Sequence, residues 1–487
     1  KAAAGHLASL RDGPPRAPSS PRRRKALYAL APALFVELRG SSDPDVALRH
    51  MADFVAAVGA RSSFLALLNE NPETLRLLIG LFSSSEPLSS FFLRHPELID
   101  SLVRADLARV RKERAELVGE LESLLAEAED YESRLDTIRR FRSEEFLRIG
   151  VNDIHGLLTL AEVQEQLSDL AEACLEAAIA VATDRIVEQL GPWPGRFAVI
   201  GMGKLGSREL NYNSDLDLIF IWDAPSDAVG GVTPGEYFTK LAQRLLSVLQ
   251  VKTREGFAYR IDTRLRPSGA QGPLVSSLDS FREYHRTSSH VWERQALTRA
   301  RAVAGAPSLS EAVERIIEEF VYGRGLSDEE RAEIARLRAR MESELARETP
   351  TRWNLKTGRG GLVDVEFVVQ MLQLAHGHVH PPIRQRRIEA ALDALHRAGL
   401  LADGPFERLA EGHRFLRILE SRLRLESEQA VEIVDIGDPD VEILARRLGF
   451  TGTSDDVRDA FQRDLRRIRE HVRAAYDEVF GHGAPRD

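Results

Sequence analysis

The stretch that most constrains the fold is residues 201–220, GMGKLGSRELNYNSDLDLIF, which follows the apolar run 197–200. Two apolar runs separated by a glycine-containing turn and a short polar segment predict a strand, a turn and a second strand. Because side chains alternate faces along a strand, Asp215 and Asp217 share one face of the second strand. Two carboxylates on one rigid face, beside backbone N–H groups and Lys204, predict a site for Mg²⁺ and a nucleotide triphosphate.

The turn itself carries groups that can hold phosphates. It is not a P-loop, because no G-x-x-x-x-G-K-[ST] is present, and its glycines do not fit the dinucleotide fingerprint G-x-G-x-x-G. We expect the phosphates to lie over Gly203 to Ser207. The residues predicted to bind the nucleotide are Gly203, Lys204, Gly206, Ser207, Ser214, Arg264 and Arg266.

A third carboxylate lies further along the chain. Residues 259–265 alternate apolar and polar side chains, which predicts a half-buried strand with Asp262 on its polar face. If this strand pairs beside the first aspartate strand, Asp215, Asp217 and Asp262 converge as catalytic residues and as ligands of two metal ions. Arg264 and Arg266 would neutralise the charge that grows in phosphoryl transfer. A D-x-D pair alone also occurs at ordinary strand starts, so the prediction depends on the turn and the third aspartate.

Four stretches in this order resemble the glutamine synthetase adenylyltransferase family. The likeness runs from about residue 28 to the end of the chain, and the four stretches are GMGKLGSRELNYNSDLDLIF, YRIDTRLRPSGAQGPLVSS, WERQALTRARAVAG and LKTGRGGLVDVEFVVQ. The resemblance implies a DNA polymerase β-like nucleotidyltransferase core that uses ATP with two Mg²⁺. It also implies transfer of AMP to a tyrosine of glutamine synthetase, with a PII-type signalling protein and glutamine as effectors.

The direction of the reaction is less firmly indicated. Family members are bifunctional: one half attaches AMP and the other removes it by phosphorolysis. This chain has one such domain, and it resembles the helical middle plus the C-terminal, AMP-attaching half. The run RLRPSG is typical of the attaching half, whereas GMGK and WERQA also occur in the removing half. Ser207 stands where the family usually has a second glycine.

Two other classes of function stay open. One is a regulatory or binding module whose nucleotidyltransferase core is inactive, which the intact set of three aspartates disfavours. The other is a nucleotidyltransferase for a small molecule such as an aminoglycoside, which the large helical flanks disfavour. We therefore expect AMP transfer to a protein, with removal of AMP as the alternative.

Composition limits partners and compartment. The net charge of −9 argues against broad nucleic-acid binding. No segment is long enough to span a membrane. The single cysteine, Cys174, excludes an internal disulfide and is typical of a reducing cytoplasm; it lies in an alanine-rich helical stretch and is expected in the core.

The predicted fold is a mostly α-helical multidomain chain with one α/β nucleotidyltransferase core and helical bundles on both sides. A long charged helix is predicted through the leucine stripe of 117–138, and another helix over 280–301. The predicted domains are a linker without stable structure at 1–25, a helical regulatory region at 26–140, the catalytic domain at 141–322 and a C-terminal helical domain at 323–487.

Four charged residues have open roles. Arg299 and Arg301 either reach the nucleotide or form ordinary salt bridges. Asp364 and Glu366 follow a glycine loop at a predicted helix start, where a loop can hold an anion but acidic residues also favour the helix dipole.

Overall fold

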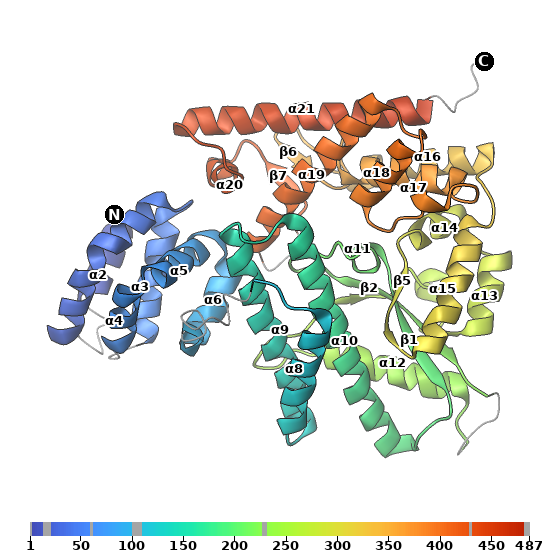
Figure 1. Ribbon diagram of the computed structural model, residues 1–487, viewed down its shortest axis with the longest axis horizontal. Coiled ribbons are helices and arrows are strands. Elements are labelled where there is room, and N and C mark those ends of the chain that lie inside the picture. Colours follow the sequence, from blue (N-terminus) through green and yellow to red (C-terminus); the bar gives the residue numbers. More distant parts are fainter. Residues whose placement is uncertain are drawn as a thin grey trace.

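Helices surround one small mixed sheet near the centre of the molecule (Figure 1). The computed structural model describes residues 2–12, 21–58, 62–99, 110–225, 231–427 and 431–481. Helical regions precede and follow the α/β core, which confirms the predicted fold class.

The N-terminal helices pack into a bundle of their own. Asp43 caps one of them by accepting a hydrogen bond from the Val46 N–H, as its Asp-Pro start predicts. The linker predicted at 1–25 is wrong for residues 2–12, because an alanine-rich helix forms there and buries Leu10 against the bundle. The elements are α1 (Ala2–Asp12), α2 (Pro21–Gly40), α3 (Pro44–Ala57), α4 (Ser62–Glu70), α5 (Pro72–Ser84), α6 (Glu86–Arg94) and the 3₁₀ turn η1 (Pro96–Leu98).

Three longer helices connect this bundle to the sheet. The single charged helix predicted through 117–138 is wrong: the stripe is divided between α8 (Arg114–Glu127) and α9 (Tyr131–Ile154). Asp130 starts α9 by accepting a hydrogen bond from the Ser133 N–H, and this local cap outweighs the continuous leucine pattern. The predicted boundary at residue 140 therefore falls inside α9. Next comes α10 (Leu160–Leu190), which starts with a capping box of Thr159 and Glu162 and buries Cys174, as expected for a core residue.

The sheet has the order β3-β2-β1-β5, with β4 also paired to β2. The central pair of strands is antiparallel, with Gly201 opposite Leu218. Both β3 and β4 run parallel to β2, at successive parts of its other edge. The strands are β1 (Arg196–Gly201), β2 (Leu216–Asp223), β3 (Ile261–Asp262), β4 (Val275–Ser277) and β5 (Arg301–Gly305).

Each face of the sheet packs against a different hydrophobic core. Val199, Leu216 and Leu218 point to the core formed with α9, α10 and α12 (Pro234–Gln250). Ile200 and its neighbours on the other face pack against the helices that follow the sheet. The alternation places the aspartate face of β2 toward these later helices.

The helix predicted over 280–301 is wrong, because that segment is divided in three. It forms α13 (Leu278–Thr287), α14 (Val291–Leu297) and the start of β5, and Ser277 and His290 start the two helices. The remaining elements are α11 (Gly203–Gly206), η2 (Gly269–Gln271), α15 (Pro307–Tyr322), α16 (Asp328–Leu345), β6 (Arg352–Asn354), α17 (Leu362–His376), η3 (Pro381–Ile383), α18 (Ile388–Arg397), α19 (Asp403–Glu426), β7 (Ile433–Asp435), α20 (Val441–Arg447) and α21 (Ser454–Gly481).

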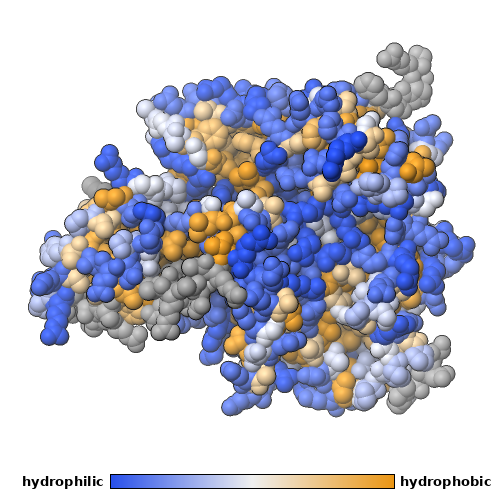
Figure 2. Space-filling view, viewed as in Figure 1, coloured by the Kyte–Doolittle hydropathy of each residue, from blue (hydrophilic) through white to orange (hydrophobic). Residues whose placement is uncertain are grey.

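The visible surface is largely hydrophilic, with apolar patches near the junction of the N-terminal and C-terminal helices (Figure 2). Within the part of the chain that the structure describes, no helix combines the length and the apolar character needed to cross a bilayer.

Candidate functional site

The turn between β1 and β2 packs directly against the aspartate strand. Gly203 has a φ of +51°, and a Cβ at this position would lie 3.1 Å from a carboxylate oxygen of Asp217. The Met202 N–H donates to the Asp217 carbonyl oxygen over 2.9 Å. Glycine is favoured at 203 because both the left-handed backbone and the close carboxylate disfavour a side chain.

The three predicted aspartates meet at one edge of the sheet. In the parallel pairing of β2 with β3, Asp217 lies opposite Asp262, and Asp215 immediately precedes β2. The Leu216 N–H donates to the Arg260 carbonyl oxygen over 2.9 Å, which continues the pairing. The predicted neighbouring strands are therefore confirmed, although only two residues of the strand expected at 259–265 join the ladder.

Asp217 is the most perturbed of these carboxyl groups. Burial, then the charges of Asp262 and Asp215, raise its pKa to about 6, and the opposing effects of Lys356 and Lys204 only partly compensate. A buried carboxylate crowded by like charges is stabilised by a bound cation. Because Mg²⁺ prefers carboxylate oxygens, the donor chemistry of the three aspartates fits this ion.

Asp262 already has a partner. Nε of Arg264 lies 2.8 Å from one carboxylate oxygen and 3.0 Å from the other, and these contacts lower the pKa of Asp262. Among the described residues, no three His, Cys, Asp or Glu side chains are arranged as they would be to hold a metal ion. In this structure the exposed Arg264 side chain occupies the Asp262 carboxylate.

Arg266 is held by the loop that follows β3. Its guanidinium donates to the carbonyl oxygens of Thr263, Ala270, Gly272 and Pro273. These bonds fix the backbone of the loop beside Asp262. In this structure Arg266 therefore supports the loop. The predicted contact of Arg266 with phosphate stays a prediction.

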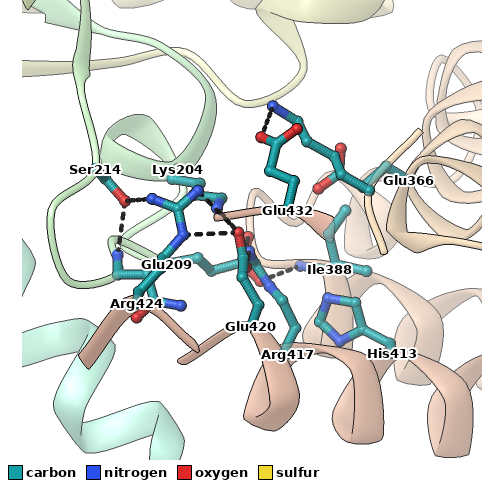
Figure 3. A network of polar contacts seen from close by, with 12 residues as sticks. Lys204, Glu209, Ser214, Glu366, Ile388, His413, Arg417, Glu420, Arg424 and Glu432 are labelled. Atoms are coloured by element: carbon teal, nitrogen blue, oxygen red, sulfur yellow. Dashed lines mark hydrogen bonds and ion pairs between the residues drawn. The ribbon is translucent and has the colours of Figure 1, made fainter. Parts of the chain in front are cut away.

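Lys204 connects the turn to the C-terminal helices. Its ammonium group forms an ion pair with Glu420 of α19, and Arg417 and Arg424 bind the same carboxylate from the positions before and after it (Figure 3). Burial lowers the pKa of Lys204 to about 7, and the nearby arginines and Lys356 add to the effect while Glu420 opposes it. The position of the lysine predicted to contact phosphates is thus set by Glu420, 216 residues later in the chain.

The other residues predicted in the turn make contacts within the protein. The Ser207 hydroxyl donates to Glu209 and accepts a hydrogen bond from Arg299, each over 2.8 Å. A Cβ at Gly206 would lie 2.0 Å from the Arg299 carbonyl oxygen. The Ser214 hydroxyl accepts hydrogen bonds from the Asn211 N–H and from Arg424 (Figure 3). These contacts hold the turn from inside.

The four residues with open roles form salt bridges in this structure. Arg299 lies between Glu209 and Glu366, at 2.8 and 3.0 Å. Arg301 pairs with the fully buried Glu172. Asp364 binds Arg338 of α16 and accepts the Gly360 N–H, which removes that N–H from any anion in the glycine loop.

Sequence reasoning missed the charged contribution of α19. The signal was present: Arg417, Glu420 and Arg424 lie at spacings of three and four residues, on the same side of the helix as buried leucines. Charged residues among the apolar positions of an amphipathic helix indicate a buried ion-pair network. The partner of that network, Glu209, also lies in the turn segment and is buried.

Known proteins match most of the chain. Residues 75–316 match a family described as glutamate-ammonia ligase adenylyltransferase, and residues 330–480 match one described as GlnD PII-uridylyltransferase. Three relatives carry the name bifunctional glutamine synthetase adenylyltransferase/adenylyl-removing enzyme. The protein of Thioalkalivibrio sulfidiphilus is 34% identical over 87% of this chain, that of Chromobacterium violaceum 37% over 84%, and that of Pseudomonas aeruginosa 33% over 88%.

The matched regions cover 46%, 45% and 47% of these three relatives, in the same order. The chain therefore spans about half the length of the curated relatives that it matches.

Proposed function

The chain belongs to the glutamate-ammonia ligase adenylyltransferase family, and we propose that it transfers AMP from ATP to a tyrosine of glutamine synthetase. The observation that carries the proposal is the set of three aspartates at one sheet edge beside the glycine turn. The tyrosine oxygen would bond to the α-phosphorus of ATP while the bond to the bridging oxygen breaks. Pyrophosphate would leave, and the phenolic proton would pass to solvent.

The residues of the site have distinct parts in this reaction. Asp215, Asp217 and Asp262 would hold two Mg²⁺ ions, which when bound supply neutralising charge on the phosphates and a lowered pKa for the attacking hydroxyl. Asp217 must lose its proton for this, because a protonated carboxyl cannot bind a cation. Arg264, once it releases Asp262, is free to turn toward the phosphates. Lys204 approaches them from the turn, with its orientation fixed by Glu420.

Phosphorolytic removal of AMP is the second candidate. It uses the same aspartates, and the names of the relatives contain both activities. The sequence stretches GMGK and WERQA, which also occur in AMP-removing halves, favour it, whereas RLRPSG favours attachment.

The proposed partners follow from the proposed reaction. We propose glutamine synthetase as the protein substrate and the cytoplasm as the compartment of the reaction. A PII-type signalling protein and glutamine are the proposed effectors, and the second family match at 330–480 supports a link to PII signalling. We propose no nucleic-acid or membrane partner.

Two incubations separate the directions. The chain is incubated with unmodified glutamine synthetase and α-labelled ATP with Mg²⁺, and in parallel with AMP-modified glutamine synthetase and phosphate. We expect label on glutamine synthetase in the first incubation and little ADP in the second. Rapid phosphate-dependent release of ADP without loading would reverse the assignment.

Variants test the aspartates in the same assay. Asp217→Asn is expected to reduce transfer at least ~100-fold, which corresponds to about 2.7 kcal/mol of barrier. The matched control is Asp393→Asn at an exposed position of α18, which should keep wild-type turnover. Near-normal transfer by Asp217→Asn would exclude the metal-binding role of the three aspartates.

A further inference from the structure

A cavity of about 440 Å³ lies where the N-terminal helices meet the C-terminal helices. Its walls come from the turn between α2 and α3, the end of α5, the residues just after α9, the end of α19, and α20 with the loop that follows it. Ribbons of these elements converge beside α20 in Figure 1. The cavity contains none of the three aspartates and none of the turn residues 203–207, so it is separate from the proposed catalytic site.

The polar side chains of the lining are basic or carry a hydroxyl group, and Ile154, Leu425 and Phe450 supply its apolar part. Four arginines line the cavity, together with His155, four serine hydroxyls and one threonine hydroxyl, and no Asp or Glu is among its described lining residues. The arginines are Arg39, Arg422, Arg446 and Arg447. Guanidinium groups match the oxygens of phosphate and carboxylate groups. The hydroxyls of Ser41, Ser42 and Ser83 donate to backbone carbonyl oxygens, so the arginines are the main donors for a ligand.

Two of these arginines are fixed in place by neighbouring elements. Arg447 pairs with Glu426 and donates to the Ser83 carbonyl oxygen over 2.7 Å, and burial lowers its pKa to about 10. Arg446 is held by Glu442 of its own helix. Their carboxylate partners lie outside the lining, so the described wall of the cavity carries four arginines and no carboxylate.

The other two arginines are better placed to contact a ligand. Arg39 is exposed, and no ion pair of its side chain occurs among the described residues. Arg422 uses only Nη1 in its pair with Asp153, over 2.8 Å. A volume of this size accommodates a small metabolite. We propose that the cavity binds a small organic polyanion, a phosphate ester or a polycarboxylate.

The cavity is connected to the aspartate strand through one carboxylate. Asp153 is 5% exposed and binds Arg422 with one oxygen, while its other oxygen accepts the Tyr212 hydroxyl over 3.1 Å. Tyr212 is fully buried three residues before Asp215. Arg422 is also two residues from Glu420, which holds Lys204. An anion that draws Arg422 from Asp153 therefore changes the support of both Tyr212 and the catalytic turn.

Binding is tested by calorimetry on the full chain in EDTA, so that no divalent metal recruits the probes to the aspartates. The probes are ribose 5-phosphate, a phosphate ester, and citrate, a polycarboxylate; the tighter of the two identifies the ligand class. We expect one saturable site, and at least a ~10-fold higher Kd for both Arg39→Glu and Arg422→Gln, about 1.4 kcal/mol each.

The matched control is Arg336→Glu, which makes the same charge change as Arg39→Glu at an exposed position of α16 and should leave Kd unchanged. No saturable binding of either probe, or equal binding by wild type and both cavity variants, would overturn the proposal. Arg39 is exposed, so its variant keeps the test valid if Arg422→Gln fails to fold.

The connection is tested by hydrogen–deuterium exchange over residues 211–217. We expect the bound probe to change the exchange rate of this segment at least ~2-fold in the wild type but not in Tyr212→Phe, which lacks the hydroxyl bonded to Asp153. This readout needs no AMP transfer, so its failure differs from a failure of the proposed function. An unchanged segment in the wild type with probe bound would exclude the connection. An accompanying change in transfer rate is expected as well, and that expectation rests on the proposed function.

Discussion

The helices before the catalytic core and the helices after it look alike in sequence but differ in what they give the site. Both flanks bury stripes of leucine and phenylalanine. Among the described residues, polar contacts that α1 to η1 make with the rest of the chain reach the end of α9, α19, α20 and the loop after α12, but not the turn or the three aspartates. The C-terminal flank places Glu420 and Arg424 directly against Lys204 and Ser214.

The difference shows that an apolar helical pattern predicts that a helix packs, but not whether its side chains contact the candidate site. An apolar stripe needs only a neighbouring surface, whereas a charge buried within it needs one particular partner. The C-terminal flank therefore contacts the turn between β1 and β2 directly, whereas the N-terminal flank contacts α9 and α19, which pack nearer to it.

The largest expected effect is a loss of stability in both flanks that is accompanied by a loss of activity in only one of them. Leu78→Ala in α5 and Leu416→Ala in α19 each remove a fully buried side chain. Each is expected to lower the free energy of unfolding by about 2–5 kcal/mol, because a cavity adds to the lost burial. Leu78→Ala should keep wild-type kcat/KM for AMP transfer, whereas Leu416→Ala should also lose activity because it loosens the helix that carries Glu420.

Urea denaturation followed by tryptophan fluorescence, together with transfer assays at 25 °C, checks both variants. Equal loss of activity in the two would show that the flanks support the site in the same way.

Much of the fold was predictable because local rules agree with the packing. The strand–turn–strand unit and the neighbouring third aspartate were predicted and are observed. The errors arose where a short polar segment interrupts a longer pattern. Asp130 starts a new helix inside the leucine stripe, and His290 does so inside the helix predicted over 280–301.

Only those parts of the candidate site that lie on the turn and its neighbouring strands could be predicted from the sequence. Asp215, Asp217 and Asp262 lie on strands whose pairing follows from alternation. The partner of Lys204 did not follow, because Glu420 is 216 residues away and nothing local selects it. The same holds for Ser207, predicted to bind phosphate, whose hydroxyl is occupied by Glu209 and Arg299. Long-range pairing of charges is what the sequence leaves unspecified.

A second effect concerns Asp217 in β2, whose raised pKa is only partly opposed by Lys356 of the C-terminal flank. Asp217 has a pKa raised from 3.8 to about 6, so the folded protein binds this proton more tightly than the unfolded chain does. Stability is therefore lost as pH rises from 3.8 through about 6, and the full loss of about 3 kcal/mol is present above pH 6. In EDTA, Asp217→Asn should be more stable than wild type by up to this amount at pH 8.

Near pH 4 the extra stability of Asp217→Asn over wild type should vanish, because wild-type Asp217 is then protonated in the folded state. Urea denaturation at both pH values checks the prediction, with Asp393→Asn as the control that changes nothing. A variant less stable than wild type at pH 8 would mean that the Asp217 carboxylate is stabilised in the metal-free fold.

The smallest expected effect compares the same substitution in the two flanks. Glu420→Gln removes the charge that holds Lys204, Arg417 and Arg424 together, and should lower kcat/KM for ATP about 10-fold, or about 1.4 kcal/mol. The matched substitution is Glu86→Gln in α6, which removes a half-exposed ion-pair partner of Arg49 in α3. It is expected to leave transfer unchanged, because exposed ion pairs contribute about 0–1 kcal/mol.

A pH profile distinguishes positioning by Glu420 from general support of the fold. Lys204 is protonated below its pKa of about 7 and neutral above it, so transfer that depends on its charge should decline as pH rises through 7. Without the Glu420 charge, burial and the two arginines act unopposed, so the decline should move to lower pH. In Glu86→Gln it should stay where the wild type has it. A uniform loss in Glu420→Gln at every pH would mean that α19 supports the turn only by packing, and the two flanks would then differ in degree alone.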